Sequence, residues 1–128
     1  MGAWKMLEKI GKGQYIALKS YKKNGEGKIT PVWVCLLENR IYVSTSAESW
    51  KVKRIRRNGQ IAICSSNATG KPKSAWIDAQ AVIREEAPLK EKVKQAMVKK
   101  YRLQYRLIRF LERLSGSQAS DVVIEITA

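Results

Sequence analysis

The fold of this chain is constrained most by short segments in which apolar and polar residues alternate as in a β-strand. Turn residues end each of them. The segments are residues 15–21, 28–37, 40–44, 60–65, 74–84 and 122–126. Asn24-Gly25 lies between the first two, and this pair indicates a β-hairpin because both central residues of its turn need positive φ. Pro31 has no amide hydrogen and so indicates a sheet edge or a bulge. Six short strands, mostly in hairpin order, predict a small antiparallel barrel, because closure removes exposed strand edges.

Helical patterns flank these strands. A short helix over residues 4–10 is ended by Gly11. A second helix is expected over residues 45–57, where Thr45-Ser46-Ala47-Glu48 fits a capping box. Pro88 opens a long helical region, compatible with one helix or with two, before the last strand. The sequence therefore predicts a mainly β fold with flanking helices.

The length and the charge limit the organisation and the chemistry. With 128 residues, the chain is expected to form a single domain, residues 1–128, with a helical insertion at about 88–114. It carries 25 Lys and Arg against 11 Asp and Glu, a formal charge of +14, which favours an anionic partner. It has no histidine, which excludes Ser-His-Asp and Cys-His catalytic units and a His-bearing zinc site. Any chemistry must come from other side chains or from a bound cofactor.

The cysteines and the absence of long apolar runs indicate a location. Cys35 and Cys64 lie inside apolar segments without CxxC spacing, so we expect buried free thiols in a reducing compartment. No stretch approaches the roughly 20 apolar residues of a membrane span, and no signal-peptide core is present. A cytoplasmic protein that does not enter a membrane is expected.

The segment from Ser44 to Arg57 is the best candidate for an anion site. A strand ends there, a hydroxyl-rich turn follows, and a helix begins with its free amides and positive dipole end directed at the turn. Lys51 lies about one turn into the helix, within reach of a phosphate. The alternative is that Val52 and Ile55 face the core and the cations form a solvated face. Five cations in seven residues repel one another, which favours the anion site.

Carboxylate chemistry has little support in the sequence. Glu85 and Glu86 precede Pro88 in a turn, and Asp78 is the only acid expected to be partly covered. No carboxylate pair of the glycosidase kind is predicted.

Three segments together resemble one known family. They are Thr30-Pro31-Val32-Trp33-Val34, then Ile41-Tyr42-Val43-Ser44-Thr45, then Ser49-Trp50-Lys51-Val52-Lys53-Arg54-Ile55-Arg56-Arg57-Asn58. From about Tyr15 to Arg84 the chain is similar to the pyridoxamine 5'-phosphate oxidase-like FMN- and deazaflavin-binding split barrels, and most to the small coenzyme F-420-dependent oxidoreductases. The resemblance implies a six-stranded antiparallel split β-barrel, a homodimer, and a cofactor bound in a groove between protomers.

The resemblance also implies roles for particular residues. The cofactor ring would be bordered by Thr30, Pro31, Val32 and Trp33. The cofactor phosphate would be held by Thr45, Ser46, Ser49 and Lys51. Arg54 and Arg57 are weaker candidates, for the acidic tail of a deazaflavin, and Trp76 of the partner protomer would form a wall of the pocket.

The function that follows is hydride transfer between FMN or coenzyme F-420 and an unknown small acceptor, with the chemistry carried by the cofactor. The chain departs from the family in showing no residues that correspond to a pyridoxamine-phosphate substrate site, and in its long basic helical region. One alternative is a cofactor carrier or sensor without turnover. Another, less favoured, is a basic β-barrel that binds nucleic acid with Lys and Arg on phosphates and with stacked Tyr and Trp.

Overall fold

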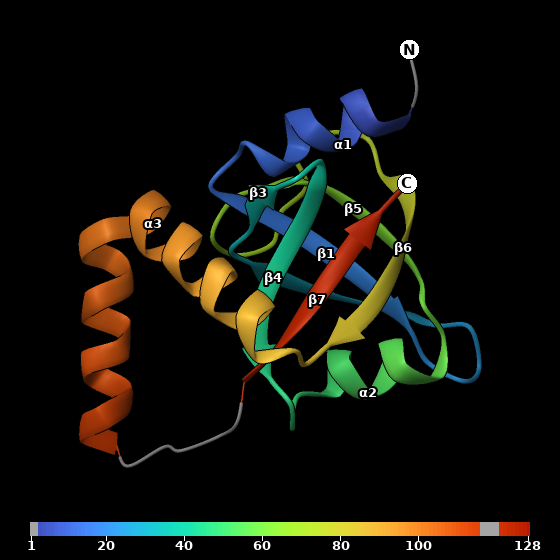
Figure 1. Cartoon of the computed structure of the whole chain (residues 1–128). Helices are drawn as coiled ribbons and strands as arrows, with labels where there is room; N and C mark the ends of the chain where they lie inside the picture. The colour runs from blue at the N-terminus through green and yellow to red at the C-terminus, as the bar shows by residue number, and fades with distance from the viewer. Residues whose placement is uncertain (1–2, 116–120) are drawn as a thin grey trace.

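The computed structural model describes residues 3–115 and 121–128, with side chains for 4–102 and 121–128. Seven strands in these residues form one antiparallel sheet that curls into a half-barrel (Figure 1). They are β1 (Tyr15–Tyr21), β2 (Gly27–Val32), β3 (Cys35–Leu37), β4 (Arg40–Ser46), β5 (Gln60–Ser66), β6 (Ile77–Arg84) and β7 (Asp121–Thr127). Their order across the sheet is β2-β1-β5-β6-β7-β4-β3. The mainly β prediction is confirmed, but the expected number of six strands is wrong.

The extra strand arises because the predicted strand over residues 28–37 is two strands. β2 pairs with β1 at one edge of the sheet, while β3 pairs with β4 at the other edge. The chain crosses between the edges at Trp33 and Val34, which belong to neither strand. Pro31 lies opposite Ala17 in β2, which is an edge strand of the sheet. The prediction that Pro31, which has no amide hydrogen, lies at a sheet edge is therefore confirmed.

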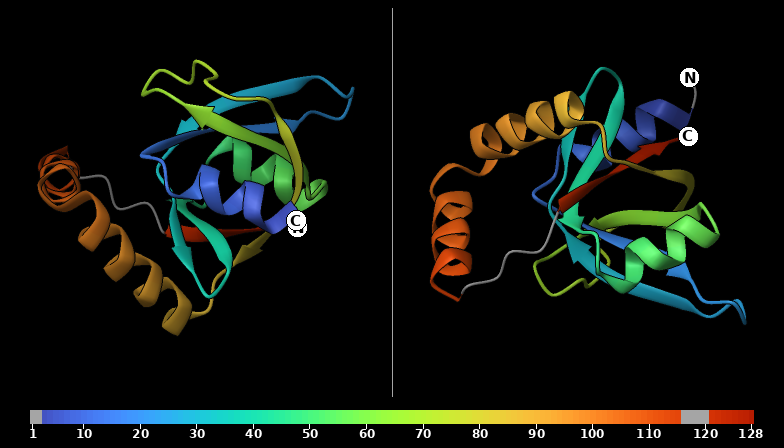
Figure 2. Two further views of the ribbon diagram at one scale, coloured as in Figure 1. Left: turned by 90° about the horizontal axis from the view of Figure 1, so that it is seen from above. Right: turned by 60° about the horizontal axis from the view of Figure 1, so that its bottom comes forward.

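The helices lie around the curled sheet: α1 (Ala3–Gly11) and α2 (Trp50–Arg57) lie at its two ends, and α3 (Ala87–Ser115) lies beside it (Figure 2). The expected start of the second helix at Thr45 is wrong. Thr45 pairs with Val122 in the ladder between β4 and β7, so its backbone continues the strand and cannot cap a helix. Ser49 caps α2 instead, because the Val52 amide donates to its Oγ at 3.4 Å.

α3 consists of two helical parts. Arg102 interrupts it with φ 42° and ψ −112°, and the ribbon turns sharply there (Figure 1). This answers the question of one helix or two that the sequence left open. The first part packs Val93, Met97 and Tyr101 against Cys35, Tyr42 and Val123 on the outer face of β3, β4 and β7.

The main core lies inside the curled sheet and includes the inward side chains Ile16, Leu18, Ile61, Ile63, Ile124 and Ile126. Cys35 and Cys64 are buried free thiols, as predicted. The expectation for Asp78 is wrong, since its alternating position on β6 faces solvent. Among the described residues, Glu125 on β7 is the buried acid. It accepts a hydrogen bond from the Tyr42 hydroxyl at 3.0 Å and pairs with Arg40 and Arg84.

None of the helices in the described part of the chain is long and apolar enough to span a membrane.

Candidate functional site

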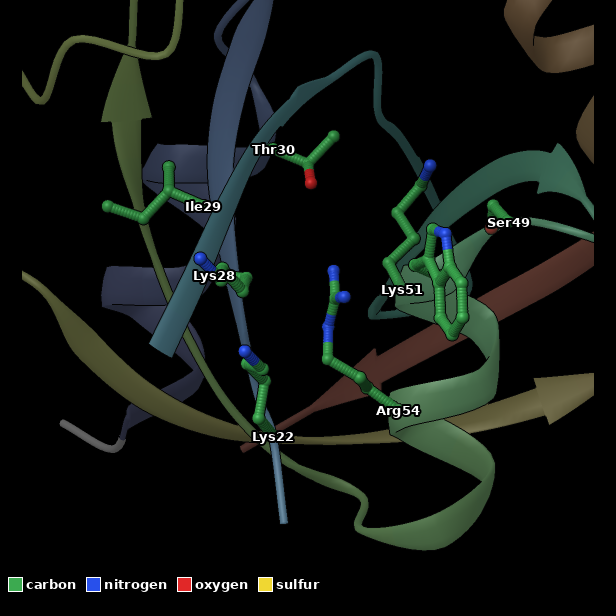
Figure 3. Close-up of a pocket in the computed structure, with 8 residues that line it drawn as sticks. Lys22, Lys28, Ile29, Thr30, Ser49, Lys51 and Arg54 are labelled. Atoms are coloured by element: carbon green, nitrogen blue, oxygen red, sulfur yellow. The ribbon is translucent and has the colours of Figure 1, made fainter. Parts of the chain in front are cut away.

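A cavity of about 560 Å³ lies between the β1–β2 hairpin and the start of α2 (Figure 3). Two lysines, an isoleucine and a threonine of the hairpin face four residues of α2 and its cap. The lining is Lys22, Lys28, Ile29, Thr30, Ser49, Trp50, Lys51 and Arg54. This volume is in the range of pockets for small ligands.

The helical period of α2 places its cations in the cavity. Val52 and Ile55 are buried in the protein interior, at 0% and 3% exposure. Lys51 and Arg54, each one residue earlier, therefore share a neighbouring face of the helix. Figure 3 shows the Arg54 side chain extending from α2 into the space below Thr30, with the Lys51 side chain rising from the helix to one side of it. Val52 and Ile55 thus face inward, as the solvated-face alternative required, but Lys51 and Arg54 are half-buried and line a cavity.

In the part of the chain that the structure describes, no carboxylate compensates the charge on this wall. Within the described residues, neither Lys51 nor Arg54 forms an ion pair. Burial, and secondly the charge of Arg54, lowers the pKa of the Lys51 amine from its ordinary 10.5. Two half-buried cations without a counter-ion favour the binding of an anion there.

The opposite wall differs in its electrostatics. Glu26 lies at the tip of the hairpin and pairs with Lys22 and Lys28, both at 3.3 Å. Hydrogen bonds from Lys28 and Lys22 lower the pKa of the Glu26 carboxyl. The hairpin lysines are therefore partly neutralised by their own element, and the uncompensated charge lies on α2.

The rim of the cavity is apolar. Trp50, at the first position of α2, is 70% exposed, and Ile29 on β2 is 49% exposed. The Lys53 ammonium lies 4.6 Å from the centroid of the Trp50 ring. Apolar side chains suit a planar ring, and the cations Lys51 and Arg54 suit a phosphate, so the chemistry of the lining fits FMN or a deazaflavin cofactor.

The structure brings four of the predicted cofactor residues together. Thr30, Ser49, Lys51 and Arg54 line one cavity, and the Thr30 hydroxyl is directed into it (Figure 3). Their contacts with a cofactor stay predictions.

The other seven predicted residues lie outside this lining. Three of them have defined neighbours: Trp33 stacks on Tyr101, Arg57 donates to the Tyr21 carbonyl at 2.5 Å, and Trp76 lies under the Lys19 ammonium at 4.1 Å. Four lie in the strands β2 and β4, namely Pro31, Val32, Thr45 and Ser46. Whether they contact a cofactor also stays a prediction.

Sequence reasoning missed three residues of the hairpin wall, namely Lys22, Lys28 and Ile29. Lys22 and Lys28 flank the Asn-Gly turn, so a hairpin prediction brings them close to each other. Their position opposite α2 depends on the curl of the sheet, which no local pattern reports.

Comparisons with known proteins agree with this architecture. No curated protein sequence matches the chain significantly. A conserved hypothetical protein from Mycobacterium tuberculosis is 16% identical, with 100% of this chain and 81% of that chain covered and a TM-score of 0.70. The heme storage protein from Vibrio cholerae is 14% identical, with 99% and 90% covered and a TM-score of 0.65.

A third similar structure is a pyridoxamine 5'-phosphate oxidase-related, FMN-binding protein from Nostoc punctiforme. It is 10% identical, with 99% of this chain and 81% of that chain covered and a TM-score of 0.61. At these identities the three structures show a shared fold. The sequence profile of pyridoxamine 5'-phosphate oxidase, in turn, matches residues 5–128. Since that match spans nearly the whole chain, the protein belongs to the pyridoxamine 5'-phosphate oxidase family.

Proposed function

We propose that this protein is an oxidoreductase that binds FMN or coenzyme F-420 in the cavity between β2 and α2 and transfers a hydride between that cofactor and a small acceptor. The observation that carries the proposal is the pair Lys51 and Arg54, which are half-buried, have no acidic partner among the described residues and line a cavity with an apolar rim. Family membership and a similar FMN-binding protein support a flavin.

Each wall has a separate task in this proposal. Lys51 and Arg54 neutralise the phosphate, and the first amides of α2 add donors beside it. Trp50 and Ile29 cover part of the ring and exclude water from one side. The cofactor supplies the hydride chemistry when bound, which suits a chain without histidine.

We further propose that the active form is a cytoplasmic homodimer. Trp50 is 70% exposed at the cavity rim, so a second copy that brings Trp76 near the cofactor would cover it. Two buried free thiols are consistent with a reducing compartment.

Haem is the rival cofactor that the Vibrio cholerae structure suggests. This chain has no histidine to serve as an axial ligand, which favours a flavin over haem. Adding haemin and recording its absorbance tests this directly, and a sharp band from specifically ligated iron would favour the rival.

Titration with FMN, riboflavin and coenzyme F-420, followed by absorbance and fluorescence, tests cofactor binding. We expect Lys51→Gln to weaken FMN binding by about tenfold or more, since it removes a charge-assisted contact. Lys53→Gln is the matched control, because Lys53 carries the same charge on the same helix but does not line the cavity. If neither cofactor binds or raises the melting temperature, the proposal is wrong.

Hydride transfer needs a separate assay. Reduction of the bound cofactor by NADPH or by a reduced deazaflavin, followed by reoxidation with small acceptors, is expected for an enzyme. Tight binding with a complete lack of exchange would instead indicate a carrier or sensor. Binding to RNA or single-stranded DNA that weakens steeply with salt would favour the nucleic-acid alternative.

A further inference from the structure

We propose that Ser20 is a positioning residue for the anion site, because its hydroxyl holds the Arg54 guanidinium with the terminal nitrogens free for a phosphate. The inference rests on the proposed function only in naming the cofactor as the source of that phosphate. It assigns a binding role to a β1 residue that does not line the cavity.

The contact itself is short and partly buried. Arg54 Nε donates to Ser20 Oγ at 2.7 Å, and Ser20 is 0% exposed. A guanidinium has five N–H donors, so this bond uses one and leaves the four on Nη1 and Nη2. In Figure 3 the guanidinium end extends from α2 into the space between Lys51 and the hairpin.

The position of Ser20 in its strand is unusual for a polar residue. Ile16 and Leu18, at the same alternation on β1, belong to the main core, and Ser20 is the next residue on that face. A buried hydroxyl costs free energy unless it forms a hydrogen bond. The Arg54 guanidinium is the group that satisfies it, so the contact explains why a serine stands where an apolar residue would bury more surface.

The benefit to binding is preorganisation. Ordering a free arginine costs side-chain entropy each time an anion binds. Anchoring Nε beforehand leaves a planar fork with the geometry for two parallel hydrogen bonds to a phosphate. Lys51, three residues earlier on α2, adds a point charge beside this fork.

Arg57 shows what a different anchor does. Its Nη2 donates to the backbone carbonyl of Tyr21, the residue after Ser20, and Arg57 does not line the cavity. A terminal nitrogen is therefore spent on the protein instead of being left for a ligand. Arg56→Ala removes the same charge from the same helix and is the matched control for Arg54, because Arg56 is exposed, pairs with Glu85 and does not line the cavity.

The experiment measures how much the phosphate adds to binding, as the ratio of the riboflavin Kd to the FMN Kd. We expect Ser20→Ala to lower this ratio about fivefold to tenfold while the riboflavin Kd changes less than twofold, and Ser20→Thr to restore it. Arg54→Ala should lower the ratio at least as much, and adding Ser20→Ala to it should cause no further loss. Arg56→Ala should leave the ratio within twofold of the unaltered protein.

Two results overturn the inference. One is a Ser20→Ala protein with an unchanged ratio, and the other is independent, multiplicative losses from Ser20→Ala and Arg54→Ala. Should Ser20→Ala not fold, Arg54→Lys keeps the charge and loses the anchored fork. We expect it to lower the ratio as Arg54→Ala does, and an unchanged ratio there also overturns the inference.

Inorganic phosphate, titrated by ³¹P NMR, separates this inference from the proposed function. If phosphate binds with the same order among the variants while no flavin binds, the cofactor proposal fails and the role of Ser20 stands. If flavin and phosphate bind without dependence on Ser20, the reverse holds. A protein that binds neither overturns both.

Discussion

The indole of Trp33 lies flat on the phenol ring of Tyr101, with centroids 4.3 Å apart and planes inclined by 7°. Trp33 lies in the crossover between β2 and β3, and Tyr101 lies on α3. The residue before Tyr101 reinforces this contact, because Lys100 Nζ donates to the carbonyls of Gly11, Gly13 and Val34 at 3.0, 2.7 and 2.8 Å. α3 therefore stabilises the crossover segment that joins the two edges of the sheet.

Tyr101→Phe is expected to lower the free energy of unfolding by about 1–3 kcal/mol. The Tyr101 hydroxyl donates to the Gln14 carbonyl at 2.7 Å and accepts from the buried Val34 amide at 3.0 Å. Removing it leaves that amide without this partner, while the ring still stacks on Trp33. Urea denaturation followed by circular dichroism measures the change.

Tyr21→Phe is the control for this prediction. The Tyr21 hydroxyl has no hydrogen bond to the described residues, so its removal should change stability by less than about 0.5 kcal/mol. Equal effects of the two substitutions would contradict the role of the Tyr101 hydroxyl.

Local patterns predicted most of the elements and the antiparallel β1–β2 hairpin, but not the pairing of strands far apart in the sequence. The alternation over residues 28–37 is continuous in the sequence, and nothing in it marks the crossover at Trp33, because the break reflects pairing with β1 on one side and β4 on the other. The capping box at Thr45 was equally convincing in isolation. Thr45 pairs with β7 instead, a strand more than 70 residues away along the chain, so the helix does not begin there.

Only part of the candidate site was predicted, because the rest of it also depends on contacts between segments far apart in the sequence. Lys51 was predicted from its position one turn into a helix that follows a hydroxyl-rich turn, and Arg54 from the family resemblance. The proximity of the hairpin to α2 and the contact between Ser20 and Arg54 depend on how the sheet curls. That curvature is a tertiary property, so the hairpin wall and Ser20 were not predictable from spacing.

Alkaline pH is expected to destabilise the protein partly through Cys35. Burial raises the pKa of this thiol from its ordinary 9.0 to about 11, and the nearby Lys100 lowers it by a smaller amount. The unfolded chain therefore ionises the thiol first, so this contribution is complete below about pH 9 and is lost as the pH rises toward 11.

Comparison with Cys35→Ala isolates this effect from the other groups that titrate there. Between pH 8 and 10.5 the stability of the unaltered protein should fall by about 2 kcal/mol more than that of Cys35→Ala. Urea unfolding at a series of pH values measures both curves. Parallel curves would show that burial does not hold the thiol protonated.

The affinity for the cofactor phosphate should fall as the pH rises, and the fall should begin at a pH below the ordinary pKa of a lysine. Burial, then the charge of Arg54, lowers the pKa of Lys51, and the neutral amine contributes no charge to the site. Above about pH 8 the phosphate of FMN is fully ionised, so a further loss of affinity reports the protein. The decrease should begin below pH 10.5 and should be absent in Lys51→Gln but present in Lys53→Gln. Calorimetry should also detect proton uptake on binding in that range.

Trp50 separates binding from folding, because it is 70% exposed and contacts the Lys53 ammonium at its ring face. Trp50→Ala should therefore change the free energy of unfolding by less than about 1 kcal/mol. If Trp50 covers the cofactor ring, the same substitution should weaken riboflavin and FMN binding equally, by roughly threefold to tenfold, and Trp50→Phe should restore part of the loss. Flavin titrations of the three proteins measure this.

Trp33→Ala is a comparison for Trp50→Ala. It should lower the free energy of unfolding more than Trp50→Ala does, because it removes the ring that stacks on Tyr101. If Trp50→Ala binds riboflavin and FMN normally, the cofactor ring does not lie against Trp50. The ratio of the two affinities tests the phosphate contacts of Lys51 and Arg54 independently of that result.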